Sequence, residues 1–96
     1  MTEKNIKKLI LALKAIAHPL RFKIISGLML KKECNVKLMS EKLKTTQPTV
    51  SQHLTVLKNA GVITGTRRGN QICYSITNPD ICKMFESLGL SADLIN

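Results

Sequence analysis

The segment that follows Thr46 constrains the fold of this chain more than any other. Thr46 is a favourable N-cap, Pro48 is tolerated in the first turn of a helix, and Gly61 is typical of the position where a helix ends. Between them, apolar side chains recur at intervals of three and four, which is the period of one helical face. These side chains are Val50, Leu54 and Leu57. The segment predicts an amphipathic helix that ends near Asn59 and must pack one face against other elements.

The opposite face of this helix carries short hydroxyl and amide side chains. Gln can bind adenine through two hydrogen bonds, and Ser and Thr can reach base edges or phosphates. The N-terminus of a helix also favours a phosphate group. We therefore expect this face to read double-stranded DNA. The candidate contacts are Gln47, Thr49, Ser51, Gln52, His53 and Thr55, with Lys44 and Thr46 in the turn before the helix. For His53 an interior or backbone-bonding role within the motif is the alternative to a base contact.

Three more helices are expected upstream. An apolar stripe predicts the first helix over Asn5–Ala17, where Ile6, Leu9, Ile10, Leu13 and Ile16 share one side. Pro19 follows a break at His18 and starts a second helix that runs to about Met29. A polar connection over 31–35 leads to a third, short helix over Val36–Leu43. The third and fourth helices, joined by a tight turn, have the layout of a helix-turn-helix.

Two short β-runs follow the fourth helix. Val62–Arg67 and Gln71–Ile76 are bridged by a turn at 68–70, which predicts a hairpin with Arg67 and Arg68 beside its tip. There the two arginines could reach the DNA backbone or a minor groove. A last helix is expected from Asp80 to about Leu90. The predicted fold is one winged helix-turn-helix domain over residues 1–96, mainly α with a β-hairpin wing, in the order α-α-α-α-β-β-α.

The charge of the chain suits a polyanionic partner. Fifteen Lys and Arg against six acids give a net charge of +9. Residues 36–70 hold six basic side chains and one acid, so the predicted reading helix and hairpin form the electropositive part. A solvated basic surface without a ligand is the alternative that charge alone leaves open.

Other classes of protein have little support in the sequence. No stretch approaches the ~20 apolar residues of a membrane span, and the polar start predicts no signal peptide. There is no Gly-rich phosphate loop and no metal-ligand cluster, and neither His has a credible nucleophile partner. We therefore expect a cytoplasmic protein that is not an enzyme, with no cofactor, no metal and no membrane partner.

Three stretches resemble the ArsR (arsenical-resistance repressor) family of winged helix-turn-helix transcriptional repressors. His18–Ile25 resembles the opening of that family's second helix, although His18 stands where the family usually has Asp. Gln47–Leu57 is similar to its recognition helix, and Ile72–Ile76 to the end of its wing. The resemblance runs from about Leu9 to Leu90. It implies a homodimer joined through the first and last helices, bound to an inverted repeat and released by a chemical signal.

The family's metal sites do not match this sequence. The arsenic and cadmium sensors carry two Cys at the start of the third helix, at places that are Asn35 and Lys37 here. The zinc sensors carry His and acidic ligands at the ends of the last helix, at places that read Asn78, Asp80, Ser91 and Leu94. One carboxylate cannot complete a tetrahedral site, so the resemblance implies no metal site.

The sequence fits a thiol-based sensor better than it fits a metal sensor. The segment around Cys34 resembles the sulfide- and persulfide-responsive branch of the family, in which a second Cys lies on the last helix. That second position is Asp93 here, so Cys82, earlier on the same helix, is our candidate partner of Cys34 in a thiol sensor for a small sulfur compound or an oxidant. Pairing of Cys34 with Cys73 of the hairpin, or three free thiols in a reducing cytosol, stay open. A regulator without an inducer and a winged helix that contacts proteins are the remaining alternatives.

Overall fold

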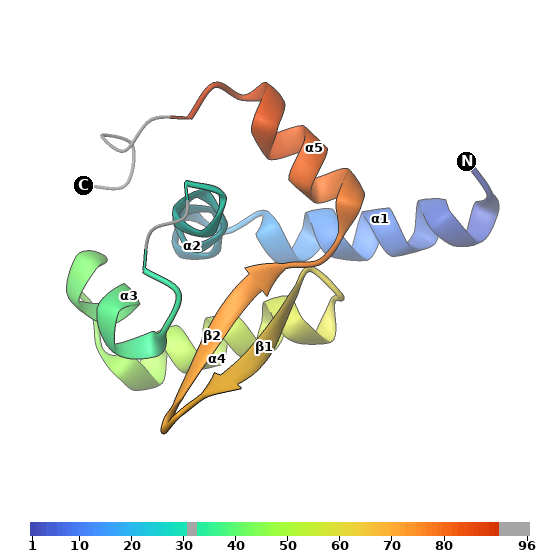
Figure 1. Ribbon diagram of the computed structural model, residues 1–96. Helices are drawn as coiled ribbons and strands as arrows, with labels where there is room; N and C mark the ends of the chain where they lie inside the picture. The colour runs from blue at the N-terminus through green and yellow to red at the C-terminus, as the bar shows by residue number, and fades with distance from the viewer. Residues whose placement is uncertain (31–32, 91–96) are drawn as a thin grey trace.

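The computed structural model describes residues 1–30 and 33–90. Over these ranges the chain forms a body of helices from which a two-stranded antiparallel hairpin projects (Figure 1). The elements are α1 (Glu3–Ile16), α2 (Pro19–Met29), α3 (Val36–Lys42), α4 (Gln47–Asn59), β1 (Ile63–Arg68), β2 (Gln71–Ile76) and α5 (Pro79–Ser87). The predicted winged helix-turn-helix and its element order are confirmed. The last helix ends earlier than expected, and the wing turn is shorter, because Arg68 pairs with Gln71 and leaves only Gly69 and Asn70 between the strands.

Local capping explains why the helix boundaries follow the sequence closely. Each helix is preceded by a residue whose side chain accepts a hydrogen bond from a backbone N–H of the first turn. A proline at the first or second position also pre-sets the backbone of α2, α4 and α5. The capping residues are Thr2, His18, Asn35, Thr46 and Asn78.

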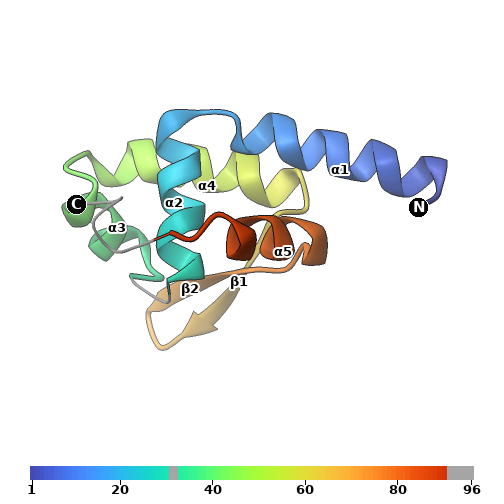
Figure 2. The same cartoon turned by 90° about the horizontal axis from the view of Figure 1, so that it is seen from above.

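The core lies where α4 packs beneath α1 and α2, and α5 covers it from the other side (Figure 2). Val50, Leu54 and Leu57 are buried, as the period of α4 predicted. They belong to one buried cluster with Ile25 of α2 and Phe85 of α5, both almost fully buried. The apolar face of α4 is thus fixed inside the protein, and its polar face must point outward.

Helix α1 uses its apolar stripe differently from the other helices. Its buried side chains are Ala12, Ala15 and Ile16, because small alanines allow a close approach to neighbouring helices. Ile6, Ile10 and Leu13 of the predicted stripe stay 41%, 44% and 39% exposed. The N-terminal half of α1 extends beyond the rest of the body (Figures 1 and 2). One chain alone therefore leaves an apolar ridge on α1 uncovered.

Within the described ranges, no helix is both long enough and apolar enough to cross a membrane.

Candidate DNA-binding site

The turn between α3 and α4 is held by a short set of local hydrogen bonds. Lys44 adopts a left-handed conformation with φ 55°, and the N–H of Thr45 donates to the carbonyl of Ser40 at 3.0 Å. Thr46 then caps α4, because its hydroxyl accepts from the N–H of Thr49 at 3.3 Å and donates to the Thr49 hydroxyl at 2.8 Å. These contacts fix the start of α4 relative to α3, so Thr46 and Thr49 have a structural role in addition to any contact with DNA.

Four of the side chains predicted to read bases are exposed on the outer face of α4, whereas Thr49 and His53 are half-buried. Gln47, Ser51 and Thr55 recur at intervals of four, and Gln52 lies beside them. The Thr55 hydroxyl donates to the Ser51 carbonyl at 3.0 Å, which leaves its methyl group available for apolar contact. An exposed row of amide and hydroxyl groups on a helix that is firmly packed behind is the arrangement that major-groove reading needs.

The wing carries two exposed arginines beside its tip, and Arg68 lines a cavity that also includes Met29 of α2 and Glu86 of α5. Arg67 and Arg68 end β1, next to the two-residue turn, and their strand partners are Ile72 and Gln71. The tip of the hairpin points away from the helical body (Figure 1). Arginines at such a tip suit contacts to the phosphate backbone or to a minor groove, which position a protein on DNA.

The structure adds polar residues that the sequence did not single out for DNA. A groove between the wing and the helix-turn-helix brings the reading residues Gln47 and Ser51 near the start of α3 and the wing turn. Its additional polar lining residues are Asn35, Lys37, Asn70 and Gln71. The side chain of Asn35 accepts from the N–H of Leu38 at 2.9 Å and donates to Gln71 at 3.3 Å. Because α3 and β2 meet only in the folded chain, spacing alone could not have joined these residues.

His53 lies in a different environment from the other polar residues of α4. It is half-buried, its Nδ1 lies 3.2 Å from Nη1 of Arg21, and its ring packs against His18 with 4.6 Å between centroids. Burial, followed by the nearby His18 and Arg21, lowers the pKa of His53 below the ordinary value of 6.5. Of the two roles left open for His53, these contacts favour the interior one.

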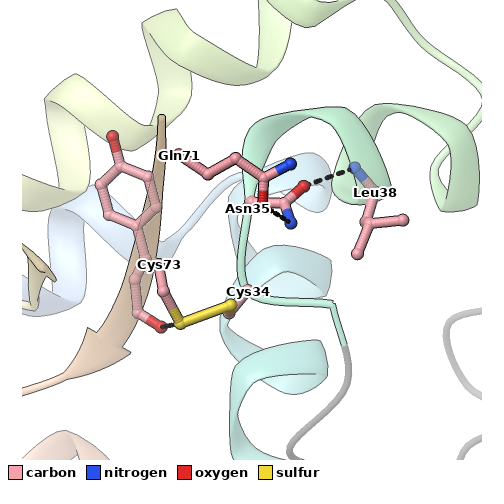
Figure 3. The surroundings of a disulfide bond; sticks show 6 residues. Cys34, Asn35, Leu38, Gln71 and Cys73 are labelled. Carbon is pink, nitrogen blue, oxygen red and sulfur yellow. Dashed lines mark hydrogen bonds between the residues drawn. A yellow bond between two sulfur atoms is a disulfide. The ribbon is translucent and has the colours of Figure 1, made fainter. Parts of the chain in front are cut away.

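The cysteines pair differently from our candidate thiol sensor. A disulfide joins Cys34 to Cys73, with 4.8 Å between their Cα atoms, and ties the segment before α3 to strand β2 (Figure 3). The N–H of Tyr74 donates to the Cys34 carbonyl at 2.8 Å, so the segment before α3 lies alongside β2. The pairing of Cys34 with Cys82 is therefore wrong in this structure, and two of the three thiols are not free.

Cys82 has other neighbours. Its sulfur lies 3.8 Å from Sδ of Met29 and 3.6 Å from a carboxylate oxygen of Glu86. Burial and then Glu86 raise the pKa of the Cys82 thiol, which keeps it protonated and weakly nucleophilic. Cys73 is bonded to Cys34 in the segment before α3, whereas Cys82 of α5 contacts Met29 of α2. The sequence left pairing of Cys34 with Cys73 open, because it does not show how β2 lies beside the segment before α3.

No group of three or more His, Cys, Asp or Glu side chains that could hold a metal ion occurs within the described residues. Ser91, Asp93 and Leu94, which correspond to ligand or thiol positions in the resemblance, lie outside those residues.

Comparison with known proteins decides the family. The model of the family described as "Bacterial regulatory protein, arsR family" matches residues 18–64, which run from the cap of α2 into β1. The transcriptional repressor PagR of Bacillus anthracis is 44% identical over 69 residues, which make up 72% of this chain and 69% of PagR. The chain belongs to the arsR family of bacterial regulatory proteins. As an arsR-family protein, it is a DNA-binding transcriptional regulator and not an enzyme.

Solved structures of arsR-family relatives have the same architecture. The crystal structure of PagR matches with a TM-score of 0.82 and 35% identity, covering 92% of this chain and all of that one (100%). Reduced HlyU from Vibrio cholerae matches with a TM-score of 0.80 and 30% identity, covering 90% of each chain. The winged helix of this arsR-family chain is thus shared almost end to end with regulators of known structure.

Proposed function

We propose that this protein is a homodimeric repressor that binds an inverted-repeat operator, with α4 of each protomer in successive major grooves. The exposed polar row of Gln47, Ser51, Gln52 and Thr55, set on a helix whose other face is buried, carries the proposal. Arg67 and Arg68 of the wing add contacts to the DNA backbone beside each half-site. Centres of the half-sites then lie about 34–36 Å apart, one turn of DNA, or a multiple of that distance.

The uncovered ridge of α1 supports the dimer. Ile6, Ile10 and Leu13 form one exposed apolar line on a helix that extends from the body, and Leu88 after α5 is also 49% exposed. A chain of 96 residues with a small core gains stability by burying such a line against a second copy. A two-fold axis through α1 would also place two α4 helices symmetrically, which matches an inverted repeat.

Selection of operator DNA tests this function directly. Genomic fragments retained by the protein are footprinted, and random duplex of equal length serves as the control. We expect protection of two related half-sites on one face of the DNA, by a species of twice the protomer mass in sedimentation. Uniform binding to all fragments without a protected site would contradict a sequence-specific repressor.

We further propose that the Cys34–Cys73 pair controls DNA binding through its oxidation state. In a reducing cell a disulfide is more often a redox sensor than a permanent staple. This one connects the start of the helix-turn-helix to the middle of the wing strand, close to the groove lined by Asn35 and Gln71. One relative, HlyU from Vibrio cholerae, has been solved in a form described as reduced.

The switch needs one two-electron step. The Cys34 thiolate attacks a small disulfide RSSR, which forms the mixed disulfide Cys34–S–S–R and releases one RS⁻. The Cys73 thiolate then attacks the Cys34 sulfur, which forms the Cys34–Cys73 bond and releases the second RS⁻. With a persulfide RSSH, attack on the outer sulfur releases RS⁻ first and HS⁻ second. The bond fixes the wing at the middle of β2, so the hairpin loses the freedom to adjust to DNA together with α4. We therefore expect the reduced protein to bind the operator and the oxidised protein to release it.

Gel shifts with reduced and diamide-oxidised protein test the switch. The Cys34→Ser and Cys73→Ser variants should bind in both conditions, and Cys82→Ser should respond like the wild type. Equal affinity of the reduced and oxidised wild type would rule out this control while leaving DNA binding intact.

A further inference from the structure

Arg21 joins three helices at a point behind the DNA-facing surface. From α2, its Nε donates to the carbonyl of Ala15 in the last turn of α1. Its Nη1 lies 3.2 Å from Nδ1 of His53 on α4, and His53 directly follows the exposed Gln52. The guanidinium therefore bridges the helix that carries the apolar ridge and the helix that carries the reading residues.

The bridge requires a neutral His53. A guanidinium has only donors, so Nδ1 of His53 must be the acceptor and its ring proton must sit on Nε2. The neighbouring His18 is held in the same way, because its Nδ1 accepts from the N–H of Leu20 at 3.0 Å as the cap of α2. The two rings are 4.6 Å apart and tilted by 38°. A proton on Nδ1 of His53 removes the acceptor and sets a cation against Arg21.

The surroundings of His53 disfavour its protonated form. Burial is the largest cause, and His18 and Arg21 of α2 lower the pKa further, so the pKa of His53 lies below 6.5. Lys14 of α1 lines a groove beside Arg21, and Lys23 of α2 lines one beside His18. His18 and Arg21, both on α2, therefore oppose a positive charge on His53.

We propose that Arg21 is a positioning residue that holds the reading helix α4 to α1 through neutral His53, and that protonation of His53 weakens operator binding. The inference rests on the proposed function, because α1 supplies the dimer ridge and α4 the base contacts. A contact between the two helices then sets where each reading helix stands relative to the dimer axis. Recognition of the correct spacing depends on that position, whereas attraction to phosphates does not.

The expected change in operator affinity is opposite in sign to the effect that the added positive charge would have by itself. A protonated histidine adds positive charge, and added charge by itself strengthens binding to any DNA. A loss of operator affinity in acid, with unchanged or stronger binding to random duplex, therefore reports a displaced α4. The loss should set in as the pH falls below the pKa of His53 in the free protein, which lies below 6.5, and continue to the still lower pKa of His53 in the operator complex.

Operator affinity, measured from about pH 7.5 down to about one pH unit below the pKa that NMR gives for His53 in the free protein, tests the inference with His53→Asn as the matched variant. The amide oxygen of Asn can take the place of Nδ1 as acceptor for Arg21 and does not titrate. We expect the wild type to lose about tenfold in affinity for the operator, which is the scale of one pKa unit, and the variant to stay constant within about twofold. NMR titration of the His53 ring in the free protein should give a pKa that rises in Arg21→Met.

Two results would overturn the inference. One is a wild-type affinity that is constant or rises in acid, and the other is an equal loss in His53→Asn. If the wild type prefers no operator even at about pH 7.5, the proposed function itself has failed and the inference falls with it. Either of the first two results, with specific binding intact at about pH 7.5, removes the inference and leaves the proposed function standing.

Discussion

The backbone carbonyl of Cys34 accepts a hydrogen bond from the N–H of Tyr74 at 2.8 Å, so the segment before α3 runs beside β2. Two side-chain links lie at the same crossing, the Cys34–Cys73 disulfide and the hydrogen bond from Asn35 to Gln71 (Figure 3). The backbone and amide bonds do not depend on oxidation, whereas the disulfide does. Reduction should therefore loosen the contact between β2 and the segment before α3 without breaking it.

Oxidation should raise the stability of the folded protein. The disulfide spans 39 residues of sequence, and a link of that length restricts the unfolded chain enough to add about 2–4 kcal/mol to the free energy of unfolding. Urea denaturation of the oxidised and reduced wild type measures the difference. The difference should vanish in Cys73→Ser and persist in Cys82→Ser, because Cys82 lies against Met29 and Glu86 instead. An oxidation effect that needs Cys82 would contradict the pairing.

Gln52 and Arg68 should contribute to DNA binding in different ways. Gln52→Ala removes a bidentate amide from the exposed face of α4 and should cost about 1–3 kcal/mol on the operator, with little change on random DNA. Arg68→Ala should weaken binding to both and reduce the slope of log affinity against log salt by about one. Fluorescence anisotropy over a series of salt concentrations separates the two. Equal losses on both DNAs for Gln52→Ala would show that Gln52 does not read bases.

The cap of α4 should support the fold of the reading helix. Thr46→Ala removes the hydroxyl that accepts from the N–H of Thr49 and should lower the free energy of unfolding by about 1 kcal/mol. Thr45→Ala is the control, since Thr45 contributes a backbone N–H to the turn. Thermal unfolding measures both variants. A larger loss in Thr45→Ala than in Thr46→Ala would mean that the turn, and not the cap, holds α4 in place.

The sequence predicted the parts of this protein that depend on neighbours along the chain. The period of Val50, Leu54 and Leu57 placed the reading helix and its buried face, and Pro19 and Thr46 marked helix starts that the structure confirms. These signals are local, because a cap or a helical face is made by residues within a few positions of one another.

The contacts that join segments far apart in the sequence could not be predicted from local sequence signals. The partner of Cys34 depends on where β2 lies beside the segment before α3, and the partners of His53 depend on the packing of α2 against α4. The apolar stripe of α1 was visible in the sequence. Its division between a buried side with Ala12 and an exposed side with Ile10 was not, since it depends on the position of the other helices.

The exposed side of α1 should form the interface of the dimer. Ile10→Asp places a charge on the ridge and should convert the dimer to monomers, because a buried unpaired carboxylate is costly at an apolar interface. Leu11→Asp is the matched control: Leu11 is 59% exposed but lines a groove with Val56 of α4, on another side of α1. Sedimentation velocity should show monomers for Ile10→Asp alone, together with a strong loss of operator binding. Dimers that survive Ile10→Asp and dissociate in Leu11→Asp would move the interface to the α1–α4 groove.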